Sequence, residues 1–199
     1  MTSIRSEGSL GILSLESEEV HAEKIVLTAG AWTRSLVKSV GIELPLEVTK
    51  QQVAYFSISR DMPVVIDRVE PARYLVPQRF GAPGIKVGLH HHGEVVDPDE
   101  GPFEVTDAGI ADVTDWITEV AGEVPNLIRR ETCLYTNAPD EDFVLLQEDP
   151  FVVVSACSGH GFKFGPRIGR AVADLIEGKD PGLLNEFILR RGEAKSPLY

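Results

Sequence analysis

Residues 152–165 constrain the fold more than any other stretch of the chain. The three valines Val152 to Val154 predict a buried strand, because β-branched side chains suit a covered, pleated surface. Glycines in residues 158–165 allow a tight turn, and Pro166 stands where a helix with regularly spaced apolar residues can begin. Backbone N–H groups, a helix dipole and Lys163 would together make this corner able to bind an anion. A plain turn with a solvated lysine is the alternative.

A second corner of this kind occurs near the amino terminus. The continuous apolar run Ile25 to Leu27 predicts a strand that is covered on both faces. Small residues follow it, and a helix is predicted from Trp32 to Val40, ending at Gly41. Small residues such as Ala29 and Gly30 at such a corner indicate close backbone packing or a ligand that lies against the turn.

The middle of the chain has a different character, and Pro45 marks the predicted boundary. Extended segments separated by Pro, Gly and Asp predict an antiparallel sheet. They are residues 47–59, 63–66, 73–77, 84–91, 127–137 and 143–146. Apolar residues at helical spacing predict a helix over 106–122, capped by Thr106. A last short helix is predicted over 183–190, and residues 192–199 are expected to be disordered.

Composition narrows the class of partner. The 199 residues are 43% apolar, enough for a core, and the net charge of −12 argues against nucleic acid or an anionic membrane as the main partner. The longest apolar runs are far too short to span a membrane, and no signal peptide is recognisable. Two cysteines are too few for a disulfide framework. These features predict a cytoplasmic protein.

Several residues are candidates for chemistry. Alternation along the strand places Lys86 and His90 on one face with Gly88 between them, and Lys86 is either solvated or buried for a purpose. Three histidines follow one another at residues 90–92, but neighbours in a strand face opposite sides, so we reject a metal site there. Cys133 reads by default as a small buried hydrophobe, with a cysteine–histidine nucleophile involving His160 as the alternative.

Two motifs together resemble one enzyme family. They are Cys-Leu-Tyr-Thr-Asn-Ala-Pro-Asp-Glu-Asp-Phe at 133–143 and Ser-Gly-His-Gly-Phe-Lys-Phe at 158–164. This pair resembles the monomeric sarcosine oxidase and N-methyltryptophan oxidase family, flavoenzymes of the D-amino-acid-oxidase group. Residues 28–32, 44–46, 50–52 and 84–90 fit the same family in the same order. The resemblance implies oxidation of a secondary or N-methyl amino acid with a free carboxylate. FAD would accept the hydride, the imine product would hydrolyse, and O2 would be reduced to H2O2.

The resemblance also implies roles for individual residues. Cys133 matches the cysteine that is linked covalently to FAD, and Lys163 matches the lysine that holds the substrate carboxylate. Lys86 matches a lysine that promotes the reaction of reduced flavin with oxygen. His90 matches a histidine in the substrate cavity, and Tyr135 an aromatic residue near the flavin.

Further flavin contacts are implied at the two corners. The implied cofactor-binding residues are Ala29, Gly30 and Trp32 at the first corner and Ser158, Gly159, His160, Gly161, Phe162 and Lys163 at the second. Two positions depart from the family pattern and bear on substrate choice. Asp142 stands where the family has histidine, and Cys157 where it has phenylalanine.

The predicted fold class is α+β and D-amino-acid-oxidase-like, without the N-terminal Rossmann βαβ unit. An α/β FAD-binding part over residues 1–44 and 148–199 would flank an antiparallel substrate domain over residues 45–147. No G-x-G-x-x-G fingerprint is present, so the chain resembles a carboxyl-terminal half, and the resemblance implies a separate amino-terminal half as partner. The alternatives are a non-catalytic fragment that binds no FAD alone, and a related oxidase of pipecolate or sugar-modified amino acids.

Overall fold

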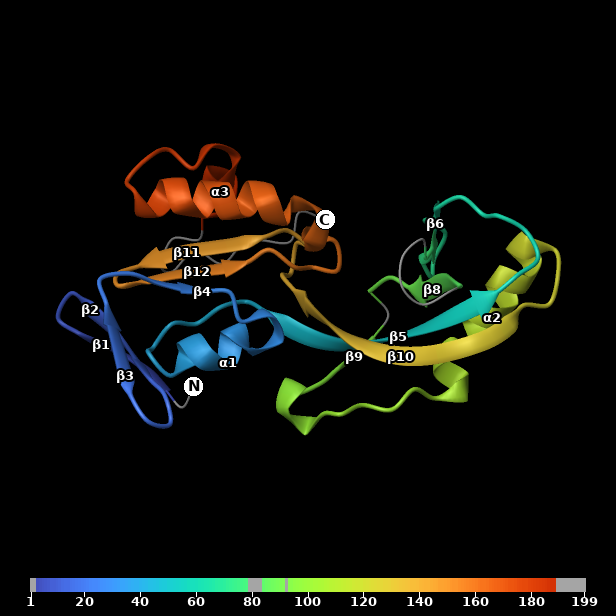
Figure 1. Ribbon diagram of the computed structural model, residues 1–199, viewed down its shortest axis with the longest axis horizontal. Helices are drawn as coiled ribbons and strands as arrows, with labels where there is room; N and C mark the ends of the chain where they lie inside the picture. Colours follow the sequence, from blue (N-terminus) through green and yellow to red (C-terminus); the bar gives the residue numbers. More distant parts are fainter. Residues whose placement is uncertain (1–2, 79–83, 92, 189–199) are drawn as a thin grey trace. The chain divides into compact units, whose positions relative to one another are not determined.

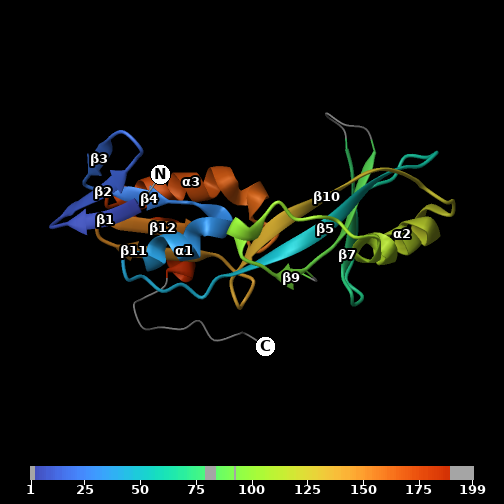
Figure 2. The same cartoon turned by 90° about the horizontal axis from the view of Figure 1, so that it is seen from below.

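The computed structural model describes residues 3–78, 84–91 and 93–188 (Figures 1 and 2). It divides into two compact units, the first made of residues 1–47 and 136–199 and the second of residues 48–135. The predicted disordered tail and the end of the last predicted helix lie outside the described residues. The described part of that predicted helix lies in a short 3₁₀ helix, Gly182–Phe187.

The first unit contains two three-stranded sheets. One has the order β1-β2-β3 and is antiparallel throughout, and the other has the order β11-β12-β4, with β12 antiparallel to β11 and parallel to β4. The strands are β1 (Ser3–Glu7), β2 (Leu10–Ser14), β3 (Glu19–Ala22), β4 (Ile25–Leu27), β11 (Val144–Glu148) and β12 (Phe151–Ser155). Two helices complete the unit, α1 (Thr33–Lys38) and α3 (Gly165–Ile176).

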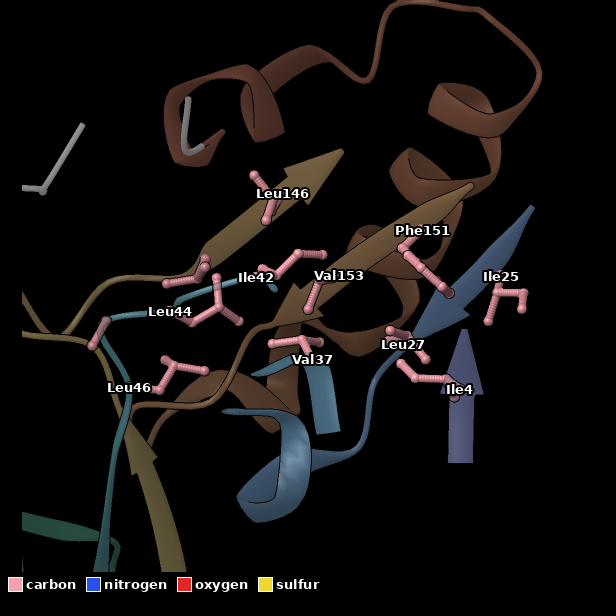
Figure 3. Close-up of a cluster of buried hydrophobic side chains, with 12 residues drawn as sticks. Ile4, Ile25, Leu27, Val37, Ile42, Leu44, Leu46, Leu146, Phe151 and Val153 are labelled. Carbon is pink, nitrogen blue, oxygen red and sulfur yellow. The ribbon is translucent and has the colours of Figure 1, made fainter. Parts of the chain in front are cut away.

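Strand β12 is buried along its whole length, as the valines predicted. Its alternate side chains enter two cores, because successive side chains point to opposite faces of a sheet. Phe151 and Val153 join the core that contains Val37 of α1, and Figure 3 shows these side chains gathered with those of β4 and residues 42–46. Val152 and Val154 pack instead against α3. The sheet is therefore covered on both faces at β12.

Strand β4 differs from the prediction. Ile25 and Leu27 are buried in the core of Figure 3, but Val26 is 39% exposed, so the predicted cover on both faces is wrong. The strand pairs only with β12 and lies at the edge of its sheet. The helix after it begins at Thr33 and is preceded by a 3₁₀ turn, Gly30–Trp32, which leaves Trp32 47% exposed instead of on the buried helix face.

The second unit is a sheet with helix α2 packed against it. The pairs β5–β8, β5–β9, β6–β7 and β7–β8 are antiparallel. The strand order is β10-β5-β8-β7-β6, with β9 also paired to β5. The strands are β5 (Glu47–Ser57), β6 (Val65–Asp67), β7 (Arg73–Pro77), β8 (Ile85–Leu89), β9 (Glu94–Val95) and β10 (Asn126–Asn137). The predicted helix is confirmed as α2 (Asp107–Ala121), in which the Thr106 hydroxyl accepts a hydrogen bond from the Gly109 N–H at 3.0 Å.

Helix α2 covers one face of this sheet. Ile110, Val113 and Ile117 pack on alternate residues of the central strands, which are Ala54, Phe56, Leu75, Ile85 and Val87. Figures 1 and 2 show α2 alongside these strands. Side chains of the intervening residues point to the opposite face, and this face carries the residues described below.

The unit boundary lies differently from the boundary that the sequence suggested. Residues 136–147 were predicted within the substrate domain, but β11 pairs with β12 over its whole length and so belongs to the first unit. Residues 10–30 predict two short strands around a polar hairpin with a third strand leading out, and β2, β3 and β4 have this arrangement. Strand β1 and the two-residue β9 were not predicted. The assignment of one part to FAD and the other to substrate stays a prediction.

Candidate active site

The predicted site residues fall into two groups, one in each unit. Lys86, His90, Cys133 and Tyr135 lie in the second unit, and the residues of the two corners, including Lys163, lie in the first.

In the second unit, the first group is assembled by strand register. Lys86 of β8 lies opposite Tyr55 of β5, and Gly88 lies opposite Tyr74 of β7. A Cβ atom on Gly88 would lie 2.8 Å from the Tyr74 hydroxyl, so the glycine makes room for that ring. The Lys86 ammonium is 5.9 Å from the centroid of the same ring. Lys86 is therefore half-buried among aromatic side chains and does not extend freely into solvent.

Cys133 on β10 is a free, half-buried thiol beside this lysine. Burial raises the pKa of the Cys133 thiol, and the positive charge of Lys86 partly offsets that rise. A lysine charge at this position favours the thiolate, the nucleophilic form of cysteine. The two residues come from distant parts of the sequence, and the fold brings them close enough to interact electrostatically.

Tyr135 completes the group. It shares a side-chain hydrogen bond with Tyr74, and burial raises the pKa of both phenols. Its ring centroid is 5.8 Å from that of His90 and 5.6 Å from that of His91, in edge-on arrangements. Both phenols are therefore protonated at neutral pH, and the imidazole rings of His90 and His91 lie beside Tyr135.

The histidine run requires a correction. The argument against a metal assumed that these residues continue a strand, but β8 ends at Leu89 and His91 has a φ of 62°. The rings of His90 and His91 consequently lie side by side, with centroids 4.0 Å apart. Within the described ranges no set of His, Cys, Asp and Glu residues is arranged to hold a metal ion. His92 lies outside those ranges.

Sequence reasoning missed a charged network next to Lys86. The Tyr55 hydroxyl donates to Glu131 Oε2 at 3.1 Å, and the Arg129 guanidinium stacks 3.7 Å from the centre of the Tyr55 ring. Arg129 also pairs with Glu131. The signal was the alternation Arg129, Glu131, Cys133 along β10, which places all three side chains on one face.

In the first unit, the two corners lie at one edge of a sheet. Strands β4 and β12 run parallel, so the turns that follow their carboxyl ends emerge on the same side. This is the edge at which open α/β sheets bind ligands. Thr33 and Ser155 stand at the two corners with buried side-chain hydroxyls, which have no hydrogen-bond partner in the part of the chain that the structure describes. Unpartnered buried hydroxyls fit a site for a polar ligand.

The second corner is tied to the turn at 138–142. Ser158 is buried, its N–H donates to Thr136 O at 2.9 Å, and its hydroxyl donates to Asp142 O at 2.9 Å. That hydroxyl also accepts from the Ala138 N–H at 3.2 Å. His160 Nε2 lies 2.8 Å from Glu141 O. Of the predicted flavin-binding side chains, Ser158 and His160 are thus directed at protein backbone.

Lys163 and Phe162 are exposed at this corner. The Lys163 ammonium donates to His160 O at 2.9 Å and lies 4.8 Å from the centroid of the Phe164 ring. Phe162 is fully exposed. Helix α3 begins directly after this turn, at Gly165, so the predicted strand, turn and helix start are confirmed.

Solved structures define the class of fold. NikD, described as an unusual amino acid oxidase, has a TM-score of 0.81 over 98% of this chain and 55% of its own, at 18% identity. L-proline dehydrogenase from P. horikoshii has a TM-score of 0.77 over 95% of this chain and 54% of its own, at 22% identity. The predicted D-amino-acid-oxidase-like fold is confirmed.

The family follows from the sequence. The model of the FAD dependent oxidoreductase family, DAO, matches residues 1–175, and the chain belongs to this family. A probable sarcosine oxidase of Arabidopsis thaliana is 32% identical over 97% of this chain and 52% of its own length. The peroxisomal sarcosine oxidase of Homo sapiens is 31% identical over 84% of this chain and 47% of its own. The chain therefore spans about half the length of the curated relatives that it matches.

In the described parts of both units, no helix is long and apolar enough to cross a membrane.

Proposed function

We propose that this chain supplies the carboxyl-terminal half of an FAD-dependent oxidase that acts on a secondary or N-methyl amino acid. The observation that carries the proposal is the proximity of Lys86 to Cys133, where the lysine charge partly offsets the rise that burial causes in the pKa of the thiol. Both residues stand at positions that the family resemblance assigns to flavin chemistry. Several relatives named sarcosine oxidase or N-methyl-L-tryptophan oxidase support the substrate class.

Bound FAD would accept the hydride of the amine and pass its electrons to O2, giving H2O2. Cys133 would hold the cofactor covalently as a thioether, and the Lys86 ammonium would partly offset the rise that burial causes in the pKa of the thiol. Lys86 would then face the negative charge that forms when oxygen is reduced. The Thr33 and Ser155 hydroxyls fit polar groups of a ligand at the corners, beside Ala29, Gly30, Trp32 and residues 158–162.

The family resemblance also assigns residues to the substrate. Lys163 would bind its carboxylate, because an exposed ammonium that already donates to a carbonyl oxygen can donate to a carboxylate instead. Within the second unit, His90 would contact the substrate, and the neighbouring ring of Tyr135 would lie near the flavin. Pipecolate and sugar-modified amino acids are the alternative substrates. Lys163, His90 and Tyr135 do not by themselves determine which amine is preferred.

Turnover tests the proposal. The joined protein, meaning this chain fused after the amino-terminal half of a sarcosine oxidase relative, should release H2O2 from N-methyl amino acids. In that protein Lys163→Met should raise KM for the amino acid by about tenfold to a hundredfold, since charged hydrogen bonds are worth roughly 1.5–3 kcal/mol. Lys179→Met, which replaces another exposed lysine of the first unit, should not. If the joined protein forms no peroxide with sarcosine, with N-methyltryptophan or with pipecolate, the proposed activity is rejected.

A second candidate is a non-catalytic fragment that binds no FAD alone and persists as such, or as the partner of a separate amino-terminal half. The coverage of about half of each relative and the exposed Val26 on the edge strand β4 favour it. The chain alone, assayed beside the joined protein, separates the two candidates. Cytoplasmic location stays a prediction, because the human and mouse relatives are named peroxisomal.

A further inference from the structure

His160 makes one contact through its side-chain ring and another through its backbone carbonyl. Its ring Nε2 is 2.8 Å from Glu141 O, and because a carbonyl oxygen only accepts, Nε2 must carry the proton and donate. Its backbone carbonyl accepts from the Lys163 ammonium at 2.9 Å. The side chain thus anchors the residue to the 138–142 turn, while the main chain holds the lysine.

Lys163 also contacts Phe164, and the rings of Phe164 and His160 pack on the same residue. The Lys163 ammonium lies 4.8 Å from the Phe164 ring. Phe164 and His160 both pack on Phe143, a buried residue just before β11, with centroid distances of 5.8 Å and 5.4 Å. The two residues that contact the ammonium, one through its carbonyl and one through its ring, therefore both pack a ring on Phe143.

The backbone at His160 is held in part by two hydrogen bonds to Cys157 O, from the His160 N–H at 3.1 Å and from the Gly161 N–H at 2.9 Å. Ser158 and Gly159 have φ values of 43° and 71°, in the left-handed region. Such a turn keeps its conformation only when contacts specify it. Ser158 fixes one side of the turn through Thr136, Ala138 and Asp142. The ring of His160 adds the side-chain contact that ties this residue to the 138–142 turn, through Glu141 O.

We propose that His160 is a positioning residue for Lys163: the hydrogen bond from its ring to Glu141 O fixes the His160 carbonyl, which in turn orients the lysine ammonium. The proposal deepens the proposed function, on which its consequence for carboxylate binding rests. It gives His160 a role that does not require contact with flavin.

Amine labelling of the 199-residue chain tests the geometry without FAD or substrate. Trace acylation with acetic anhydride, followed by peptide mass spectrometry, gives the reactivity of Lys163 relative to exposed Lys179. His160→Met removes the ring donor and keeps side-chain length. It should raise relative Lys163 labelling by about threefold to tenfold, the equivalent of one hydrogen bond. His160→Gln, whose amide can donate from the same position, should stay near the wild-type value.

Two other results would overturn the proposal. Equal labelling in the Met, Gln and wild-type proteins would show that the ring does not hold the lysine. Leu44→Ala opens a cavity in the core of the first unit and leaves the His160 contacts intact, so it is the control for general loosening. An increase in that variant as large as in His160→Met would also reject the proposal. Failure of the oxidase assay changes none of these readings, because labelling involves neither cofactor nor turnover.

Discussion

Replacing Gly161 with alanine is expected to destabilise the first unit by roughly 3 kcal/mol or more, the range of severe overpacking. A Cβ atom at this position would lie 1.7 Å from Ala156 O and 2.6 Å from Ala156 C. Both atoms belong to the backbone, so no side-chain rotation relieves the clash. The turn would have to open, and the Gly161 N–H would lose its 2.9 Å hydrogen bond to Cys157 O.

Gly169→Ala is the matched control. Gly169 lies within α3, and nothing stands within 4 Å of its added Cβ. Alanine there should stabilise the helix by up to about 1 kcal/mol. Each unit contains one of the two tryptophans, Trp32 in the first and Trp116 in the second, so urea unfolding of the Trp116→Phe background reports the first unit. Equal midpoints for the two alanine variants would contradict the close packing of the turn.

Lys86→Met is expected to slow the reaction of the reduced, FAD-containing joined protein with O2 about a hundredfold. A unit charge about 5 Å from the reduced oxygen, at an effective dielectric constant near 20, contributes about 3 kcal/mol. Reduction of the flavin by the amine should change little, because no superoxide-like charge forms in that step. Stopped-flow absorbance, with anaerobically reduced protein mixed into oxygenated buffer, separates the two steps.

Lys50→Met is the matched control for charge. Lys50 belongs to the same unit, but its ammonium pairs with Glu94 and lies over the Phe103 ring. Its replacement should leave the oxygen reaction within about twofold, because the Glu94 carboxylate already balances the charge of Lys50. A similar loss in both variants would mean that net charge, and not the position of Lys86, governs the oxygen step.

Local patterns predicted the elements whose sequence signal is complete within one segment. Helix α2 has a capping threonine, apolar residues at helical spacing, and a glycine in the left-handed conformation at its end. Strand β12 has consecutive buried valines. In both, propensity and burial favour the same structure, so no distant contact was needed to recognise them.

The contents of the site were harder to predict, because they depend on strand register. Tyr74 enters the group only because β7 pairs it with Gly88, and Tyr55 because β5 pairs it with Lys86. Alternation along one strand gives the face of a residue but not its neighbour on the next strand. The proximity of Lys86 to Cys133 was implied by family resemblance and is seen only once the sheet is formed.

The remaining differences also have local physical causes. Val26 is exposed because β4 is a three-residue edge strand, although its apolar run resembles that of a buried one. Ser158 and His160 were assigned to flavin, yet their polar side-chain atoms reach the 138–142 turn. That turn is close only because β11 and β12 form a hairpin, which brings the ends of the two motifs together.

The most direct test of FAD binding through this chain is the flavin absorbance that stays with the polypeptide after acid denaturation. The joined protein, loaded with FAD, should stay yellow after precipitation and washing, and its Cys133→Ser variant should lose all of the colour. Cys157→Ser, the matched control at the other cysteine, should keep it. Release of flavin from the unmodified protein, or its retention after Cys133→Ser, would contradict covalent attachment at Cys133.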